Sequence, residues 1–302
     1  MLEAENWFKE KIKDLISVQY QAVGGYLDGT MMSGDEEAGL YKFPKIGRLE
    51  SYEITSAIQD VAGGEAALEM LEVRPKDYEA STHLTKLDIY KMGPTAQTAL
   101  AQLLTMAIKR RRDTIKIEAL HTFTAATATQ DIGGASTMIN PFDLETGRAQ
   151  IAATGADDIG IGAVFCPIPE LWMSQLCQYK EWNDADYKGT ENLPWSQAMR
   201  GRAKTVRSVN YFTMPDEYFV DYDDGSSITT HMWARSAMGA ETPWNQEAPE
   251  FYMLPQKEGK VWLGKVGLGG CALGIQRQAV KKLRFQKITA VTEIPMLTLE
   301  AA

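Results

Sequence analysis

The stretch that decides the fold is Gly93-PTAQTALAQLLTMAIKRRRDTIKIEALHT-Phe123, which we predict to form one long helix. Pro94 has a backbone torsion already close to the helical value and no N–H to leave unpaired, so it suits the first helical position. Apolar residues recur every three or four positions along the stretch and predict one buried face. They are Leu100, Leu103, Leu104, Ala107, Ile108, Ile115 and Ala119.

A charged cluster interrupts the buried face of this helix. It consists of Lys109, Arg110, Arg111, Arg112 and Asp113, where an ordinary amphipathic helix carries fewer charges. Either the charges are solvated and the arginine stems lie over apolar neighbours, or they form ion pairs with a neighbouring element or subunit. The residues alone leave both alternatives open.

The composition is that of a globular protein with a core of its own. The 302 residues are 44% hydrophobic and 24% charged, and no low-complexity tract occurs. The 40 acidic and 31 basic residues give a net charge of -9, which argues against a surface that grips nucleic acid by neutralising phosphates. A protein that only encloses nucleic acid is compatible with this charge.

The sequence predicts a soluble protein made in the cytosol. Its first residues, MLEAENWFKEKIK, carry acids where a signal peptide has basic residues, and no apolar region follows. No apolar run approaches the ~18 residues that span a bilayer. Cys166, Cys177 and Cys271 lack CxxC spacing, so we expect reduced thiols, with an intersubunit disulfide as the alternative.

The residues before the long helix predict an arm and a β ribbon. Residues 5–17 have the pattern of a short amphipathic helix, and glycine-rich residues 18–39 isolate it. Residues 39–49 contain Pro44 and predict an edge strand. Residues 68–74 and 78–87 predict a long hairpin that is polar on both faces. A two-stranded ribbon of this kind is only marginally stable alone in water, so we expect it to pack against another chain. The alternative is an ordinary surface hairpin.

The residues after the long helix predict mixed α and β structure. A short helix or turn is expected at 142–152, and a strand at 161–166 is expected to break at Pro167 before a helix at 169–179. Further strands, rich in β-branched and aromatic residues, are expected at 204–212, 217–222, 228–238, 261–270 and 279–288. This order places the chain in the α+β class.

The sequence offers little chemistry. It has no P-loop, GxSxG elbow, HExxH or EF-hand loop, and His83, His121 and His231 lack partners at metal-ligand spacing. Carboxylate pairs at 157–158, 184–186 and 223–224 fall in predicted turns without a partnering acid or base. We therefore expect no catalytic residue, no metal and no cofactor, and we predict that the protein is not an enzyme.

One stretch matches a catalytic fingerprint formally. Gly267, Gly269 and Ala272 give a G-x-G-x-x-A pattern after the apolar VWLGKV. A dinucleotide site needs a helix after the glycines to receive the pyrophosphate, yet residues 279–288 predict a strand where that helix would run. We interpret the glycines as a tight bend between closing strands.

The order of these elements resembles the major capsid protein of tailed bacteriophages, with the Hong Kong ninety-seven fold. Local similarity is carried by QYQAVGGYLDGTMM and YKFPKIG within residues 19–47, and by residues 77–120 around KRRRD. It is also carried by AVFCPIPELWMSQLCQYKEWNDADY at 163–187 and by GGCALGIQRQAVKKLRF at 269–285. The resemblance covers nearly the whole chain and rests on the order of elements, without one invariant motif.

The resemblance implies four parts. These are an N-terminal arm at 1–49, an extended loop with a β hairpin at 50–90, a peripheral domain with a long spine helix at 91–150 and 254–302, and an axial domain at 151–253. Many relatives begin with a segment that a protease removes, whereas in this sequence the predicted arm helix comes directly after the first residues. The resemblance therefore does not establish that this protein matures by cleavage. Some relatives crosslink a lysine of the extended loop to an asparagine, and Lys76 and Lys86 are candidates by location alone.

The function that the resemblance implies is structural. The chain would self-assemble as hexamers and pentamers into an icosahedral head shell, beside a portal protein and scaffold or decoration proteins, and would enclose double-stranded DNA without sequence recognition. Assembly would take place in the host cytoplasm, the product would be the virion capsid, and no membrane would be involved. Encapsulin-type compartment shells share this fold and are one alternative; a cytosolic nucleotide-binding enzyme is the other. We expect subunits to meet at Trp7, Phe8, Lys76, Lys86, Arg110, Arg111, Arg112 and Asp113.

Overall fold

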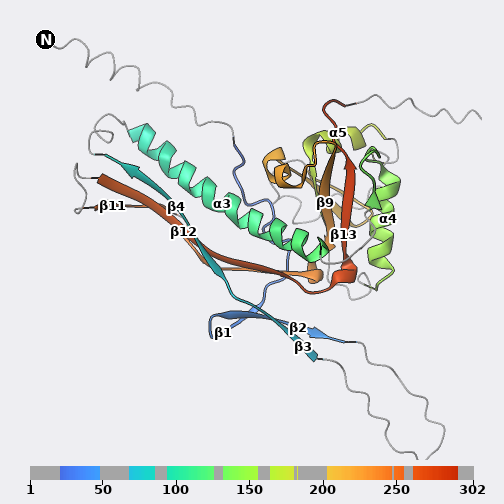
Figure 1. Ribbon diagram of the computed structural model, residues 1–302, viewed down its shortest axis with the longest axis horizontal. Coiled ribbons are helices and arrows are strands. Elements are labelled where there is room, and N and C mark those ends of the chain that lie inside the picture. Colours follow the sequence, from blue (N-terminus) through green and yellow to red (C-terminus); the bar gives the residue numbers. More distant parts are fainter. Residues whose placement is uncertain are drawn as a thin grey trace, which may run out of the picture.

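A long helix and three β-sheets make up the fold. The computed structural model describes residues 21–47, 68–85, 94–125, 132–155, 164–179, 182, 203–246, 248–254 and 261–291. Helix α3 (Pro94–Ala125) runs along a four-stranded sheet, and a six-stranded sheet with α4 (Pro141–Ala152) and α5 (Glu170–Leu176) lies beyond the C-terminal end of α3 (Figure 1). A small three-stranded sheet projects from the body. The predicted α+β class is confirmed.

Helix α3 begins where the sequence predicts and contributes to two separate cores. One group of its side chains, Leu104, Ile108 and Ile115, packs on the four-stranded sheet. A second group, Ile117 and Leu120, enters the core of the six-stranded sheet. The C-terminal turns of the helix therefore connect the two halves of the molecule.

The four-stranded sheet is built around one long strand, β12 (Val261–Gly274). It pairs antiparallel with β4 (Lys76–Leu84) on one side, and with β10 (Met238–Asn245) and β11 (Glu250–Leu254) in succession on the other. A Cβ on Gly267 would lie 2.3 Å from the ring of Trp244, and a Cβ on Gly274 would lie 2.2 Å from the ring of Phe123. The predicted bend at 267–272 is wrong, because its glycines lie inside one continuous strand.

The small sheet corrects the predicted hairpin. Its central strand β2 (Leu40–Ile46) pairs with β1 (Asp35–Glu37) and with β3 (Leu68–Val73). The predicted pairing of 68–74 with 78–87 is wrong, because β3 pairs with β2 whereas β4 pairs with β12. The short link at 74–75 takes the chain from one sheet to the other. Pro44 is tolerated in the central strand since β1 reaches only as far as Lys42.

The six-stranded sheet has the order β5-β13-β9-β6-β8-β7. The pairs β13 with β5 and β6 with β8 are parallel, and the other neighbours are antiparallel. Trp172, Phe212, Trp233 and Phe285 are fully buried in its core. The strands are β5 (Ile132–Gly133), β6 (Val164–Pro169), β7 (Ala203–Val206), β8 (Val209–Met214), β9 (Ser227–Ala234) and β13 (Val280–Gln286).

Two predicted strands in this half have a different structure. Residues 217–222 form the 3-10 turns η1 (Asp216–Tyr218) and η2 (Val220–Tyr222), in which the consecutive Tyr218 and Phe219 are both buried. Alternation along a strand would not bury two successive side chains on one face. Residues 204–212 form two strands, because Arg207 and Ser208 have positive φ and turn the chain between β7 and β8.

Three further boundaries differ from the predictions. Pro167 does not break the chain but lies inside β6, which pairs with β9 only at Val164 and Phe165. The strand predicted at 228–238 ends at Ala234, and the 3-10 turn η3 (Arg235–Ala237) separates it from β10. At the C-terminal side, η4 (Arg277–Ala279) precedes β13.

The division of the chain into four parts stays a prediction. The predicted division groups α4 and β13 with the spine helix, whereas the structure packs both in the six-stranded half, where β13 pairs with β9 and α4 lies against β13. The predicted helix at 5–17 and the carboxylate pairs at 157–158 and 184–186 lie outside the described residues. No helix among those that the structure describes is long and apolar enough to cross a membrane.

Candidate functional site

Residues 21–31 lie across the middle of α3 without regular secondary structure. Ala22, Leu27 and Met31 are buried in the main core. Trp233 in β9 donates a hydrogen bond from Nε1 to the carbonyl oxygen of Thr30 at 3.1 Å. From residue 22 onward, the segment expected to be an extended arm is therefore part of this chain's own core.

Asp113 holds this segment on the helix. Its side chain is 0% exposed, and its carboxylate accepts hydrogen bonds from the backbone N–H groups of Gly25 at 2.7 Å, Tyr26 at 3.0 Å and Leu27 at 3.2 Å. Tyr218 in η1 donates its hydroxyl to the same carboxylate at 3.1 Å. Asp113 therefore joins three parts of the chain that are far apart in sequence.

Two glycines allow this geometry. Gly24 and Gly25 both have φ near +83°, a region that other residues rarely occupy. A Cβ on Gly24 would lie 2.5 Å from the backbone nitrogen of Arg110. Successive backbone N–H groups in such a turn make a concave anion site, and here the anion is the side chain of Asp113.

Burial dominates the ionisation of this cluster. Burial raises the pKa of Asp113, and the backbone donors of Tyr26 and Leu27 and the charge of Lys116 oppose that rise. Burial also lowers the pKa of Lys116, against the charges of Asp28 and Asp113. Desolvation and the adjacent Asp113 raise the pKa of Tyr218. These shifts follow from placing charged groups in the interior of the protein.

Arg110 and Arg112 of the charged cluster, and the nearby Lys116, contact the same N-terminal segment. Arg110 donates to the side chain of Gln21 and, at 3.0 Å, to the carbonyl oxygen of Ala22. Arg112 forms an ion pair with Asp28. Lys116 Nζ lies 3.1 Å from the carboxylate of the same Asp28 and 2.9 Å from the carbonyl oxygen of Leu27.

Arg111 points to a different neighbour. Its guanidinium lies 4.4 Å from the centre of the Tyr78 ring in β4, and it forms an ion pair with Glu118 at 2.9 Å. In the described part of the chain, Arg110, Arg111, Arg112 and Asp113 each have at least one partner within the subunit. A role for these residues between subunits stays a prediction.

Sequence reasoning did not identify several members of this cluster. Asp28, Lys116 and Tyr218 are as closely involved as the predicted residues. The adjacent glycines at 24 and 25 were the available signal, since a glycine pair marks backbone conformations that other residues avoid. No local pattern indicated Tyr218, which is 105 positions from Asp113.

An apolar patch is exposed on the β2–β3 hairpin. Ile46 lies opposite Leu68 and Pro44 opposite Met70 in the ladder, and all four are exposed, Leu68 to 79%. On the other face of the same strands, Phe43 and Leu71 pack in a small core. The hairpin therefore has one face covered by its own chain and one apolar face that the described residues leave uncovered.

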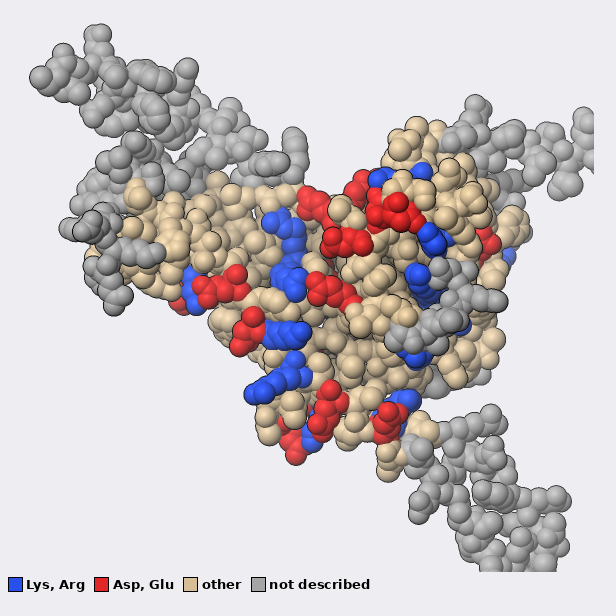
Figure 2. Space-filling model, viewed as in Figure 1, with Lys and Arg blue, Asp and Glu red and all other residues tan. Residues whose placement is uncertain are grey.

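A second exposed apolar strip follows one edge of the four-stranded sheet. Phe251, Tyr252 and Met253 in β11 and Trp244 in β10 are between 39% and 49% exposed. The outer edge of β11 pairs with no other described strand, and the outer edge of β10 is bridged by Met32 at Met238–Ala240 and is unpaired beyond it among the described residues. Charged side chains instead gather in a band across the middle of the face shown in Figure 2, where lysines and arginines alternate with acids.

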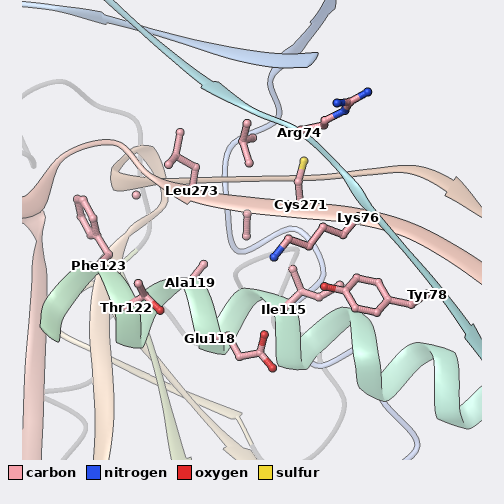
Figure 3. Close-up of a pocket in the computed structure, with 14 residues that line it drawn as sticks. Arg74, Lys76, Tyr78, Ile115, Glu118, Ala119, Thr122, Phe123, Cys271 and Leu273 are labelled. Carbon is pink, nitrogen blue, oxygen red and sulfur yellow. The ribbon is translucent and has the colours of Figure 1, made fainter. Parts of the chain in front are cut away.

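A groove of about 320 Å³ lies between α3, β4 and the C-terminal half of β12. Figure 3 shows Lys76 extending from β4 across this groove toward α3, with Phe123 and Leu273 at its other end. The side chain of Lys76 has no ion pair or hydrogen bond with any residue that the structure describes. Its proposed place between subunits stays a prediction. Trp7, Phe8 and Lys86 lie outside the described residues.

Two histidines lie where α3 meets the six-stranded sheet. The rings of His121 and His231 are 5.9 Å apart, edge to face, and His231 Nε2 lies 3.0 Å from the hydroxyl of Thr124. Burial, with smaller contributions from His121 and Lys282, lowers the pKa of His231 to about 3. Both rings are therefore neutral groups of a packed junction.

The described residues do not assemble a recognisable catalytic centre. No group of three or more His, Cys, Asp or Glu among them is placed to hold a metal. Asp223 and Asp224 accept hydrogen bonds from the backbone of their own turn, as the sequence predicts. Cys166, Cys177 and Cys271 form no disulfide with one another.

Comparisons with known proteins agree on one family and one fold. The family model described as phage capsid protein matches residues 4–287. No curated protein matches the sequence. Among solved structures, the chain is similar to the capsid of the cyanophage P-SCSP1u, with 11% identity, a TM-score of 0.59, and 90% of this chain and 91% of that chain covered.

Two further structures show the same fold. The chain resembles a protein of Mycobacterium phage Adephagia with 12% identity and a TM-score of 0.60, covering 93% of this chain and 98% of that one. It also resembles the head protein of the Helicobacter pylori bacteriophage KHP40 with 11% identity and a TM-score of 0.58, covering 90% and 93%. At these identities the likeness concerns the fold alone.

Proposed function

We infer the role of this chain from its family: it belongs to the phage capsid protein family and is a structural protein of an icosahedral phage shell. The predicted major capsid protein and its location in the virion capsid are thereby confirmed. Subunits of such a shell must bind copies of themselves, so the open question is which surfaces they use.

We propose that the exposed patch on the β2–β3 hairpin is one of the surfaces that bind a neighbouring subunit. Four apolar side chains, Pro44, Ile46, Leu68 and Met70, form a contiguous face on a two-strand ribbon. A ribbon of this size cannot bury both of its faces by itself, and a contiguous exposed apolar face is typical of an interaction site. This patch is the observation that carries the proposal.

The edge of β10 and β11 is a second proposed contact. An unpaired strand edge with aromatic side chains invites pairing or packing with another chain, and aromatic residues are enriched at the centres of interfaces. Contacts of this kind, repeated around a closed shell, add up to cooperative assembly.

The remaining partners are proposals that rest on the family. We propose that the subunits form hexamers and pentamers beside a portal protein, with scaffold or decoration proteins, and that assembly takes place in the host cytoplasm. The shell would enclose double-stranded DNA without sequence recognition, which suits a chain of net charge -9 that does not coat phosphates. We also propose that the protein has no catalytic activity.

The hairpin proposal is tested by charging the patch. We expect the double variant Leu68→Lys, Met70→Lys to keep the unfolding midpoint of the subunit, because both side chains are already exposed, and to form no closed shells in electron micrographs. The matched control is Glu69→Gln, on the opposite face of the same strand, where Glu69 pairs with Lys45 at 2.9 Å. Normal shells from the double variant would refute the role of the patch.

The cargo separates the phage shell from an encapsulin-type compartment. Shells purified from infected cells should contain double-stranded DNA that resists nuclease until the shell is opened. An enzyme in place of nucleic acid would instead favour the compartment.

A further inference from the structure

A polar pocket lies on the side of α3 away from β4. It has a volume of about 370 Å³ and is enclosed by three parts of the chain. Gly24, Gly25 and Asp28 come from the N-terminal segment, Lys109 and Arg112 from α3, and Asn245 and Gln246 from the end of β10. The pocket exists because Gly24 brings the N-terminal segment into contact with the helix backbone.

Lys109 is the one member of the charged cluster without a partner among the described residues. Arg110, Arg111, Arg112 and Asp113 all have ion pairs or hydrogen bonds within the chain, whereas the Lys109 side chain has none to a described residue. Lys109 is nevertheless half-buried at the pocket wall. A half-buried ammonium group that lacks an acceptor favours an anion from outside the chain.

Further donors of the pocket also lack acceptors. Arg112 lines the pocket and pairs with Asp28 through its terminal nitrogen. Gln246 accepts a hydrogen bond from Gly267 N at 3.1 Å through its carbonyl oxygen, and within the described residues its amide NH2 has no acceptor. The Asn245 side chain likewise has no hydrogen bond to a described residue.

The charge of the pocket wall is positive. Asp28 is its only carboxylate among the lining residues, and this carboxylate is shared by Arg112 and by Lys116 behind it. Two cations therefore offset Asp28, and the charge of Lys109 is left uncompensated. The pocket combines one free ammonium, one guanidinium and two amides, which are the groups that bind phosphate oxygens in proteins.

We propose that this pocket binds a phosphate group, with Lys109 as its main charge and Asn245 and Gln246 as hydrogen-bond donors. The proposal goes beyond the shell function, because it concerns a site within a single subunit. The phosphate comes either from free phosphate or from the backbone of nucleic acid, which share the same phosphoryl oxygens. A single such site is compatible with the net charge of -9, since it neutralises one phosphate and does not track a strand.

The test is calorimetric titration of the unassembled subunit with inorganic phosphate and, separately, with a short DNA duplex. We expect phosphate to bind, and Lys109→Met to weaken that binding about tenfold or more, because a charge-assisted contact is lost while the aliphatic stem is kept. Lys76→Met is the matched control, since it removes an equally unpaired lysine from a different groove; it should bind phosphate as the wild type does. Unfolding midpoints of both variants verify that they are folded.

Each outcome decides. If the duplex binds at a site that depends on Lys109 and phosphate competes with it, the natural ligand is the backbone of nucleic acid. If phosphate binds and the duplex does not, the natural ligand is free phosphate. Absence of phosphate binding by the wild type, or equal weakening by Lys109→Met and Lys76→Met, overturns the proposal. These results do not depend on shell formation, so the proposal and the assembly role can fail separately.

Discussion

Removal of the Asp113 carboxylate should detach the N-terminal segment from α3. In Asp113→Ala, the backbone donors of Gly25, Tyr26 and Leu27 and the hydroxyl of Tyr218 lose their common acceptor. The bonds from Leu27 and Tyr218 are fully buried, and the other two are partly buried.

The magnitude follows from the donors left behind. A buried donor without an acceptor costs about 1–3 kcal/mol. With two such donors, and a smaller cost for the two that water can reach, we expect the free energy of unfolding to fall by about 3–5 kcal/mol. Because domains are stable by only about 5–15 kcal/mol in total, this is a large fraction of the stability of the subunit.

The measurement is urea unfolding of the unassembled subunit, followed by tryptophan fluorescence. Trp233 reports on the segment directly, since its indole donates to the carbonyl oxygen of Thr30. The control is Glu118→Ala on the same helix, which removes the same charge but only a surface pair with Arg111, so we expect a loss of no more than about 1 kcal/mol. Equal losses in the two variants, or a loss below about 1 kcal/mol in Asp113→Ala, would refute the reasoning.

Three other perturbations have defined outcomes. Deletion of residues 1–17 should leave a folded subunit that closes no shells in electron micrographs, and normal particles would show that these residues are dispensable. Burial lowers the pKa of His231 from 6.5 to about 3, so its contribution to stability is complete above pH 6.5 and is lost as the pH falls; between pH 7 and pH 5 the free energy of unfolding should fall by about 2 kcal/mol through this residue. Urea unfolding at the two pH values should show a smaller fall in His231→Gln, and an identical fall would contradict the assignment. Gly274→Val should lower the free energy of unfolding by about 1–3 kcal/mol, and with it the melting temperature, because the new side chain overlaps the ring of Phe123. An unchanged melting curve would contradict this close contact between α3 and β12.

The sequence predicted what depends on local pattern. The long helix is encoded by the spacing of its apolar residues and by Pro94, both of which act within a few positions. The turn at Asp223 and Asp224 is equally local, because these side chains bind the backbone of the next residues. Such features need no knowledge of the rest of the chain.

Strand partners were not predictable in the same way. Residues 68–73 and 76–84 are adjacent and both extended, so a hairpin was the simplest interpretation, yet β4 pairs with β12 almost two hundred positions away. The choice depends on glycines in β12 that admit Trp244 and Phe123, and on the helix that covers the strand. Tertiary packing of this kind overrides local preference in sheets.

The charged cluster shows the same limit at a candidate site. Four cations and an acid left two alternatives open, solvated charges or ion pairs with a neighbouring element or subunit, and no partner residue was named. Arg110, Arg112 and Asp113 find partners in the carbonyl of Ala22, the carboxylate of Asp28 and the N–H groups after Gly24, which come from a segment that the sequence predicted to be an extended arm. Two glycines with positive φ decide that contact, and their effect becomes visible only in three dimensions.

The most direct test of the central claim is electron microscopy of the purified full-length chain. The account predicts closed icosahedral particles in which the β2–β3 hairpin of each subunit lies against a neighbour, with Leu68 and Met70 inside the contact. A small oligomer that forms no shell under any assembly condition would contradict the claim, and a shell whose hairpins point into solvent would contradict the proposed contact.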